Sequence, residues 1–187
     1  MRAFLREILA IIIVAVVIFI LLQTTIQSFE VYGDCMEPNF EEGQRLIINK
    51  AVYRFREPQR GEVIILHPPP STHQSTPFIK RIIAVPGDTI EIEEGVVYVN
   101  SSPLDEPYIK EPPSYTIKRQ KIPDNEYFVL GDNRNVAYDS HRWGTLPRQN
   151  IIGKAWLSIW PPSEWGLVAH YPLQEQLPST KLLPQLP

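Results

Sequence analysis

The sequence contains a single cysteine, Cys35, within the stretch Val31–Phe40 (VYGDCMEPNF). A thiol is a stronger nucleophile than a hydroxyl because it loses its proton closer to neutral pH, so Cys35 could attack a carbonyl carbon. The alternatives for a lone cysteine are core packing, attachment of a lipid, or a substitution without consequence. One cysteine also excludes an internal disulfide and a zinc site built from cysteines, so the fold depends on its core.

A second residue with chemical potential is Lys80, in the apolar run Phe78–Val85. A lysine accepts a proton near neutral pH only where burial disfavours its ammonium form. In a β-strand, Lys80 shares a face with Phe78 and Ile82, while Arg81 points to the opposite face. This pattern favours a desolvated amine against the core, and the alternative is a solvated lysine on an exposed strand face.

Histidine offers a further option, because His141 follows Asp139 by two residues and could join Cys35 in a nucleophile–base–carboxylate arrangement. Alternation puts Asp139 and His141 on one face without requiring contact, and we expect Arg134 to form a structural ion pair with Asp139. The remaining histidines lie in expected loop or tail segments, and they are His67, His73 and His170. We therefore expect no metal site and no cofactor.

The first element that must position these residues is an apolar N-terminal segment. Ile8–Leu22 contains no polar residue, and a helix over about residues 8–26 would cross a hydrocarbon layer of ~30 Å. Arg2 and Arg6 precede it, and no lysine or arginine follows until Arg45. The positive-inside rule therefore places the N-terminus in the cytoplasm and the body outside.

Two alternatives to a retained anchor are a cleaved signal peptide and a lipoprotein signal. A cleaved signal peptide needs an apolar region of only ~7–15 residues and a small-x-small site, and no Ala-x-Ala follows this segment. A lipoprotein signal needs a cysteine directly after the apolar run, whereas Cys35 lies well beyond Leu22 and follows Asp34. We therefore predict a single-pass protein in the cell membrane, with the lipid bilayer as a partner.

The body is predicted to be mainly β, because runs rich in β-branched residues alternate with turn signals and no long helical periodicity occurs. The predicted strands are Phe29–Tyr32, Arg45–Asn49, Glu62–Leu66, Phe78–Val85, Thr89–Ile92, Val96–Asn100, Glu126–Leu130 and Ile151–Trp160. We expect Thr89–Ile92 and Val96–Asn100 to form a hairpin around Glu93-Glu94-Gly95. The spacing is typical of an antiparallel sandwich or partly closed barrel.

The chain divides into a cytoplasmic stub with the anchor (residues 1–28), an extracytoplasmic β domain (29–160) and a proline-rich tail (161–187). Within the domain, His67–Pro77 is predicted to be a loop and Tyr108–Pro123 a long connection. The tail is expected to be loosely ordered. The net charge of −3, with both signs well mixed, provides no basic stripe, so nucleic acid is not expected as a partner.

Four motifs follow the apolar segment in a fixed order. They are Gly33-Asp34-Cys35-Met36-Glu37-Pro38, then Arg60-Gly61-Glu62-Val63-Ile64, then Phe78-Ile79-Lys80-Arg81-Ile82-Ile83-Ala84-Val85-Pro86-Gly87-Asp88, and Gly131-Asp132-Asn133-Arg134-Asn135 with Asp139-Ser140. In order and spacing over roughly residues 1–160, the chain resembles the type I signal peptidases. These proteases remove signal peptides from exported proteins.

The resemblance implies a Ser/Lys-dyad peptidase with a signal-peptidase-like β body, and it assigns the catalytic positions to Cys35 and Lys80. The family has serine where this chain has Cys35. A further family serine that holds the lysine amine corresponds to Ala137, although Ser140 could substitute. Gly33 stands where some members carry a side-chain oxyanion donor, which leaves the Cys35 backbone N–H for that role.

Two functions remain open from the sequence. The first is a signal peptidase in which Cys35 is the nucleophile and Lys80 acts as base, or as the acid for the leaving amine. The resemblance implies that its substrates are signal peptides bound as extended strands, with small residues at −3 and −1. The second is a catalytically impaired homologue that acts as a binding or scaffold protein. A self-cleaving repressor is disfavoured, because the DNA-binding domain is absent and an anchor is present. We expect a monomer.

Overall fold

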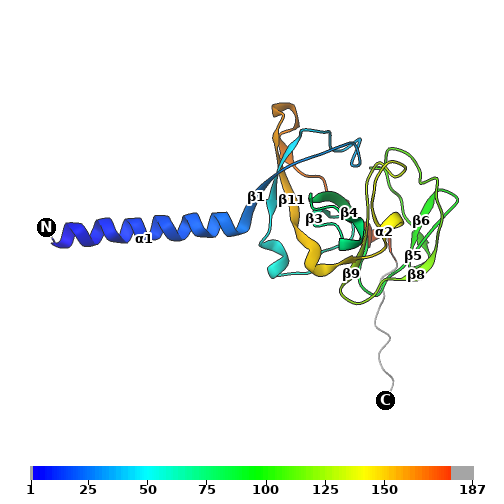
Figure 1. The fold of residues 1–187 in the computed structure, drawn as a ribbon, viewed down its shortest axis with the longest axis horizontal. Coiled ribbons are helices and arrows are strands. Elements are labelled where there is room, and N and C mark those ends of the chain that lie inside the picture. The colour runs from blue at the N-terminus through cyan, green and yellow to red at the C-terminus, as the bar shows by residue number, and fades with distance from the viewer. Residues whose placement is uncertain (1, 178–187) are drawn as a thin grey trace, which may run out of the picture.

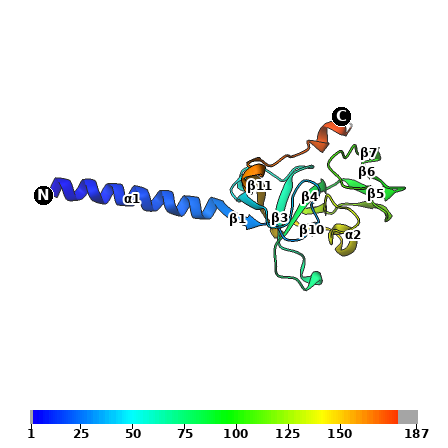
Figure 2. The same ribbon diagram turned by 90° about the horizontal axis from the view of Figure 1, so that it is seen from above.

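The computed structural model describes residues 2–177, in which a long helix, α1 (Arg2–Thr25), projects from a β body (Figures 1 and 2). The larger sheet contains β1 (Ile26–Glu30), β2 (Arg45–Asn49), β3 (Val63–Leu66), β4 (Phe78–Ala84), β9 (Glu126–Leu130), β10 (Leu146–Pro147), β11 (Ile151–Trp160) and β12 (Gly166–Leu167). The smaller sheet contains β5 (Thr89–Glu93), β6 (Val96–Val99), β7 (Ser102–Pro103) and β8 (Ile117–Lys121). Short helical turns are α2 (Ser140–Trp143), η1 (Val52–Arg54), η2 (Pro70–Thr72), η3 (Arg148–Asn150), η4 (Pro162–Glu164) and η5 (Leu173–Gln176).

Both sheets are antiparallel throughout. The larger follows the order β1-β2-β11-β3-β4-β9-β10, with β12 beside β11, and the smaller follows β7-β6-β5-β8. Register shifts along β11 and between β4 and β9 add local twist, and the larger sheet curls. The prediction of a mainly antiparallel β body is confirmed, and the predicted hairpin forms between β5 and β6.

The central strands β3 and β4 are buried on both faces, which explains their unbroken apolar runs. On one face, Val63 and Ile65 pack in a cluster with Ile79 and the buried Met36. On the other face, Ile64 and Leu66 pack with residues of β9. The turn that carries Cys35 is therefore attached, through Met36, to the core of the same sheet as Lys80.

Three segments differ from their predictions. The first strand is Ile26–Glu30 rather than Phe29–Tyr32, because the chain passes from α1 directly into the strand. The predicted connection Tyr108–Pro123 contains β8, whose exposed Lys, Arg and Gln side chains hide a strand pattern. The segment expected to be a loose tail packs on the body as far as residue 177, with Leu173 fully buried. Residues 178–187 lie outside the described part of the chain.

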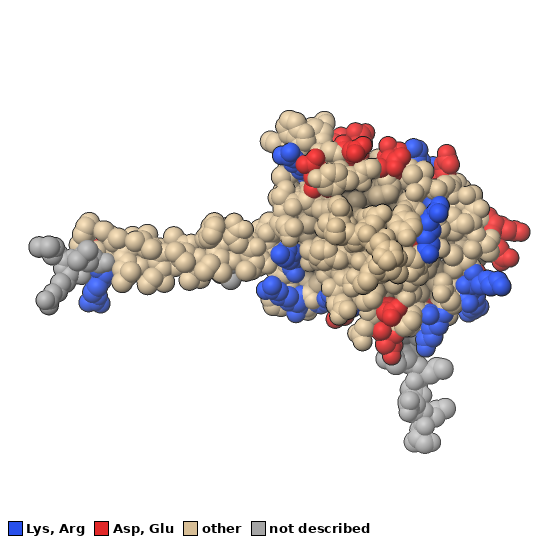
Figure 3. Space-filling model, in the orientation of Figure 1, with Lys and Arg blue, Asp and Glu red and all other residues tan. Residues whose placement is uncertain are grey.

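Helix α1 is exposed along its length and is long and apolar enough, from Arg6 to Thr25, to cross a membrane. Figure 3 shows charged side chains near its free end and over the body, and none along the shaft between them. On the face of the body shown there, acidic and basic side chains are interspersed.

Candidate active site

The turn that follows β1 and strand β4 bring Cys35 and Lys80 into contact. The Lys80 Nζ atom lies 3.0 Å from Cys35 Sγ and also donates to the carbonyl oxygen of Ile79 at 2.9 Å. Lys80 is 2% exposed, whereas Cys35 is half-buried, so the amine is withdrawn from water beside a sulfur that solvent reaches. These two side chains can therefore exchange a proton directly.

Strand alternation separates Lys80 from its neighbour Arg81 as the sequence predicts. The Lys80 amine lies 5.2 Å from the centre of the Phe78 ring, which is on its own face of β4. Arg81 points the other way and forms a bidentate ion pair with Asp132 at 2.6 and 2.8 Å. Strand β4 thus directs the Lys80 amine to the thiol and the guanidinium of the next residue, Arg81, to a carboxylate.

The backbone around Cys35 is held by the segment that follows β9. Asn133 donates its backbone N–H to the Cys35 carbonyl at 3.1 Å and its side-chain Nδ2 to the Asp34 carbonyl at 3.0 Å. A Cβ at Gly131 would lie 2.4 Å from the Cys35 carbonyl oxygen, so only glycine permits this approach. Within residues 2–177, no acceptor takes the Cys35 N–H, which leaves this donor available to an oxyanion.

The positions where the resemblance implies extra hydroxyl groups are apolar or open. Ala137 is fully buried and its Cβ packs against Gly131. Ser140 accepts a hydrogen bond from the Val129 N–H at 3.0 Å, and in the described part of the chain no side-chain hydroxyl bonds to the Lys80 amine. Gly33 has a φ of 72° and its missing side chain would meet open space.

A hollow of about 530 Å³ opens beside Cys35 and Lys80. We call it the Cys35 groove, and its apolar walls are Phe29, Tyr32, Phe78 and Ile79. Its polar wall consists of Gln74 and Thr76, from the loop between β3 and β4. The sequence indicated this loop but gave no sign that it borders the site, because the loop and Cys35 are far apart along the chain.

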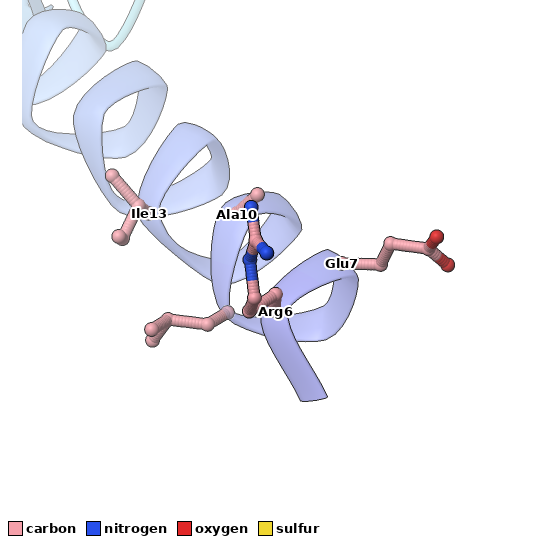
Figure 4. Close-up of a pocket in the computed structure, with 5 residues that line it drawn as sticks. Arg6, Glu7, Ala10 and Ile13 are labelled. Atoms are coloured by element: carbon pink, nitrogen blue, oxygen red, sulfur yellow. The ribbon is translucent and has the colours of Figure 1, made fainter. Parts of the chain in front are cut away.

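A second hollow, of about 600 Å³, lies along α1 and is lined by residues such as Arg6, Glu7, Ala10 and Ile13 (Figure 4). These side chains come from successive turns of one helix, and Figure 4 shows Arg6 and Glu7 extending away from each other. It contains no nucleophile with a base, so it offers no chemistry comparable to that of the Cys35 groove.

The histidine option is not assembled. His141 lies 2.7 Å from Asp139 through Nδ1, its Nε2 accepts from Arg142, and its ring stacks on Tyr115. The Cys35 sulfur instead accepts from Lys80 Nζ at 3.0 Å and donates weakly to the Ile79 carbonyl at 3.8 Å. In residues 2–177, no three His, Cys, Asp or Glu side chains are arranged to hold a metal ion.

The predicted ion pair between Arg134 and Asp139 is wrong. The buried Arg134 guanidinium pairs with Glu106 at 2.7 and 2.9 Å. Burial acts to lower the pKa of Arg134, but the Glu106 carboxylate outweighs burial and raises it. Asp139 instead accepts from the backbone N–H groups of Gly131 and His141. The true partner lies in a segment without sequence periodicity, which is why the pattern did not reveal it.

Two ionisable groups on the opposite side of β3 have strongly shifted pKa values. Burial acts to raise the pKa of Glu62, but hydrogen bonds from Arg56 and Lys154 prevail and lower it to about 2. Burial, with the nearby Lys154 charge, lowers the pKa of His170 to about 4, and its neutral Nδ1 accepts from the Val63 N–H at 3.2 Å. His170 attaches the C-terminal segment to β3, Glu62 joins β11 to the turns before β3, and neither residue lines the groove.

Comparison with known proteins assigns the family. Residues 4–160 match the family model described as signal peptidase, peptidase S26. The probable signal peptidase I-1 of Synechocystis is 41% identical over 90% of this chain and 89% of its own length. The signal peptidase I of Leptolyngbya laminosa is 45% identical over 72% of this chain and 68% of its own.

A crystal structure of a signal peptidase I from Enterococcus faecalis is also similar, with 28% identity and a TM-score of 0.46 over 53% of this chain and 97% of that one. The family match covers most of the chain, and both relatives exceed 40% identity. The chain therefore belongs to the signal peptidase family, peptidase S26, and is a peptide hydrolase of the signal peptidase I type.

Proposed function

We propose that this chain is a membrane-anchored, monomeric signal peptidase I in which Cys35 is the nucleophile and Lys80 its proton partner. The observation that carries the proposal is the 3.0 Å contact between Cys35 Sγ and Lys80 Nζ, at an amine that is 2% exposed. Relatives named signal peptidase I support exported preproteins as the substrates.

Each step of cleavage has a candidate group. Cys35 Sγ attacks the scissile carbonyl carbon, and its proton resides on Lys80. The oxyanion that forms accepts from the Cys35 backbone N–H. Lys80 then gives the proton to the departing amine, and the C–N bond breaks to leave a thioester at Cys35. A water molecule, deprotonated by Lys80, hydrolyses the thioester and restores the thiol.

The Cys35 groove fits a peptide in extended conformation. Its apolar walls, from Phe29, Tyr32, Phe78 and Ile79, can hold short side chains on the acyl side of the bond. The resemblance implies small residues at −3 and −1. Gln74 and Thr76 offer polar contacts to the peptide backbone, which an extended chain leaves unpaired.

The membrane part of the proposal rests on α1 and on a rim of aromatic side chains. Trp156, Trp160, Trp165 and Leu167 are exposed on β11 and on the loop and strand that follow it. β11 is two strands away from β1, which continues directly from α1, and Figure 1 shows these elements on the side where α1 enters the body. Such rings settle at the lipid–water interface. Arg2 and Arg6 before the apolar segment favour an N-terminus in the cytoplasm and a body outside.

The thiol role is tested by alkylation. The full chain in detergent, treated with iodoacetamide, is expected to be modified at Cys35 and to lose cleavage of a model preprotein. Cys35→Ala and Lys80→Ala, with the same far-ultraviolet circular dichroism as the natural chain, should be equally inactive. Unchanged cleavage after complete alkylation would refute the role of the thiol.

A second candidate function is a binding protein that retains the groove without turnover. It is favoured by one observation: Ala137 is buried where the resemblance implies a hydroxyl that holds the lysine. The double variant Cys35→Ser with Ala137→Ser separates the two functions. A gain of cleavage from a zero baseline would favour the binding protein. Equal cleavage by the natural chain and the double variant would favour a working thiol.

A further inference from the structure

We infer that the thioester formed at Cys35 is transferred to amines as well as to water, so that the enzyme joins the carboxyl end of the signal peptide to the α-amino group of an acceptor peptide. The inference rests on the proposed function, because it requires an acyl group on Cys35. It adds a ligation activity to the hydrolysis.

The first step of the argument is the sulfur atom. Sulfur shares its lone pairs with a carbonyl less well than oxygen does, and a thiolate is a better leaving group than an alkoxide. Amines therefore attack thioesters much faster than they attack oxygen esters, while water gains far less. A cysteine in the attacking position thus shifts the competition for the acyl group toward amines.

The second step is the surroundings of the base. The Lys80 amine bonds to Cys35 Sγ and to the Ile79 carbonyl, and among residues 2–177 no hydroxyl side chain fixes its direction. Ala137 presents only a methyl group at the place that the resemblance gives to such a hydroxyl. Water needs an oriented base before it attacks, whereas a neutral amine is already a nucleophile and loses its proton only afterwards.

The third step is the acceptor. By microscopic reversibility, an incoming amine occupies the place from which the amino end of the mature protein departed. Asp34, next to Cys35, forms no ion pair within the described residues, and Glu37 in the same turn pairs with Lys110. The Asp34 carboxylate, whose charge adds to the effect of Glu37 in raising the pKa of Lys110, attracts a peptide that bears a free amino terminus.

The reaction balances without an oxidant, reductant or cofactor. In acylation, the C–S bond forms, the scissile C–N bond breaks, and the Cys35 proton passes through Lys80 to the released amine. In transfer, the acceptor nitrogen forms a new C–N bond as the C–S bond breaks, and its extra proton returns through Lys80 to the Cys35 sulfur. The products are the mature protein and a signal peptide extended by the acceptor.

The experiment uses the full chain in detergent with a model preprotein, in the presence of increasing triglycine. N-acetyl-triglycine, which lacks the free amine, is the matched control. Mass spectrometry measures the ratio of triglycine-extended to hydrolysed signal peptide. We expect the ratio to rise in proportion to triglycine, and to be about tenfold higher than in Cys35→Ser. Ala137→Ser, which keeps the sulfur and adds a hydroxyl, should lower it.

The outcomes distinguish this inference from the proposed function. Release of mature protein with only hydrolysed signal peptide at high triglycine overturns the inference and leaves the peptidase intact. An equal ratio in Cys35→Ser overturns the role assigned to sulfur. If Cys35→Ser releases no mature protein, the test uses the natural protein and Ala137→Ser. A ratio that rises with triglycine in the natural protein and is lower in Ala137→Ser supports the inference, and a ratio that does neither overturns it. If the natural protein releases no mature protein and carries no acyl group on Cys35, the proposed function fails, and the inference with it.

Discussion

Adjacent positions of β4 hold two buried basic side chains with very different surroundings. Arg81, 1% exposed, forms two hydrogen bonds with Asp132 and a third with the Gly61 carbonyl at 3.0 Å. Its guanidinium also lies 4.3 Å from the centre of the Tyr108 ring. Lys80, 2% exposed, has one carbonyl and one sulfur as partners, and within residues 2–177 no carboxylate lies within ion-pair distance of it.

In the proposed function, this difference separates a structural cation, Arg81, from a reactive amine, Lys80. A buried charge that is paired and fully hydrogen-bonded stays charged, and removing its partner is costly. Lys80 has no such carboxylate, and its amine instead lies 3.0 Å from the Cys35 sulfur. In the proposed function, neighbouring residues of one strand thus serve stability and chemistry.

Replacing Lys80 by methionine should produce the largest effect, and on cleavage alone. The variant keeps the volume but removes the proton acceptor, so we expect cleavage of a model preprotein to fall by roughly 10⁴-fold. The unfolding temperature should stay equal or rise, because a buried polar amine is replaced by an apolar side chain. Cleavage and thermal unfolding are measured on the same sample. Cleavage within tenfold of the natural protein would contradict the assignment of Lys80.

Replacing Asp132 by asparagine should instead act on stability. The change leaves the Arg81 guanidinium buried without its counter-charge, and we expect a loss of about 3–5 kcal/mol in the free energy of unfolding. Urea titration of the full chain in detergent measures it. Asp105→Asn, at an exposed position, is the matched control and should leave stability unchanged. A similar small change in both variants would show that the pairing of Arg81 is not structural.

The free energy of unfolding should also depend on pH through His170, which lies near Arg81. Its pKa is lowered to about 4 by burial and by the Lys154 charge, against about 6.5 in an unfolded chain. Unfolding therefore takes up a proton between these values, so stability is greatest above pH 6.5 and falls by about 3 kcal/mol toward pH 4. His170→Asn, which keeps an acceptor for the Val63 N–H, should flatten this part of the profile. His67→Asn, at an exposed position, should leave it as it is.

The sequence predicts the parts of this comparison that depend on local patterns. Alternation along β4 puts Lys80 and Arg81 on opposite faces, and the apolar neighbours of Lys80 predict its burial. The order of motifs predicts that the turn of Cys35 reaches Lys80, although 45 positions separate them. Strand patterns also locate most of the larger sheet, since β-branched runs and turn residues act over a few positions.

The remaining features depend on contacts between distant segments. Arg134 pairs with Glu106 rather than Asp139, and Arg81 receives the ring of Tyr171 at 5.1 Å from a segment expected to be a loose tail. Gly61 permits that packing, because a Cβ there would lie 1.5 Å from the Tyr171 carbonyl oxygen. Neither polarity nor periodicity of the C-terminal segment reveals that it covers a buried arginine.

The smallest expected effect concerns Asn39, which connects the turn of Cys35 to the Arg81–Asp132 pair. Asn39 lies in the turn of Cys35, and its side-chain Nδ2 donates to the Tyr108 carbonyl at 2.6 Å and to Asp132 Oδ2 at 2.8 Å. We expect Asn39→Ala to lower the free energy of unfolding by about 1 kcal/mol. Cleavage should fall by about tenfold, because the turn loses its attachment to the Arg81 side and the sulfur is positioned less well.

The control for Asn39 is Asn135, whose amide also forms hydrogen bonds with the backbone, to the Pro112 carbonyl and from the Ser114 N–H, but at the surface. Asn135→Ala should lower stability by no more than Asn39→Ala does and should leave cleavage unchanged. Combining Asn39→Ala with Asp132→Asn should cost less than the sum of the two, because the variants share one hydrogen bond. Full additivity, or an equal loss of cleavage in Asn135→Ala, would mean that Asn39 does not transmit the rigidity of the Arg81–Asp132 pair to the nucleophile.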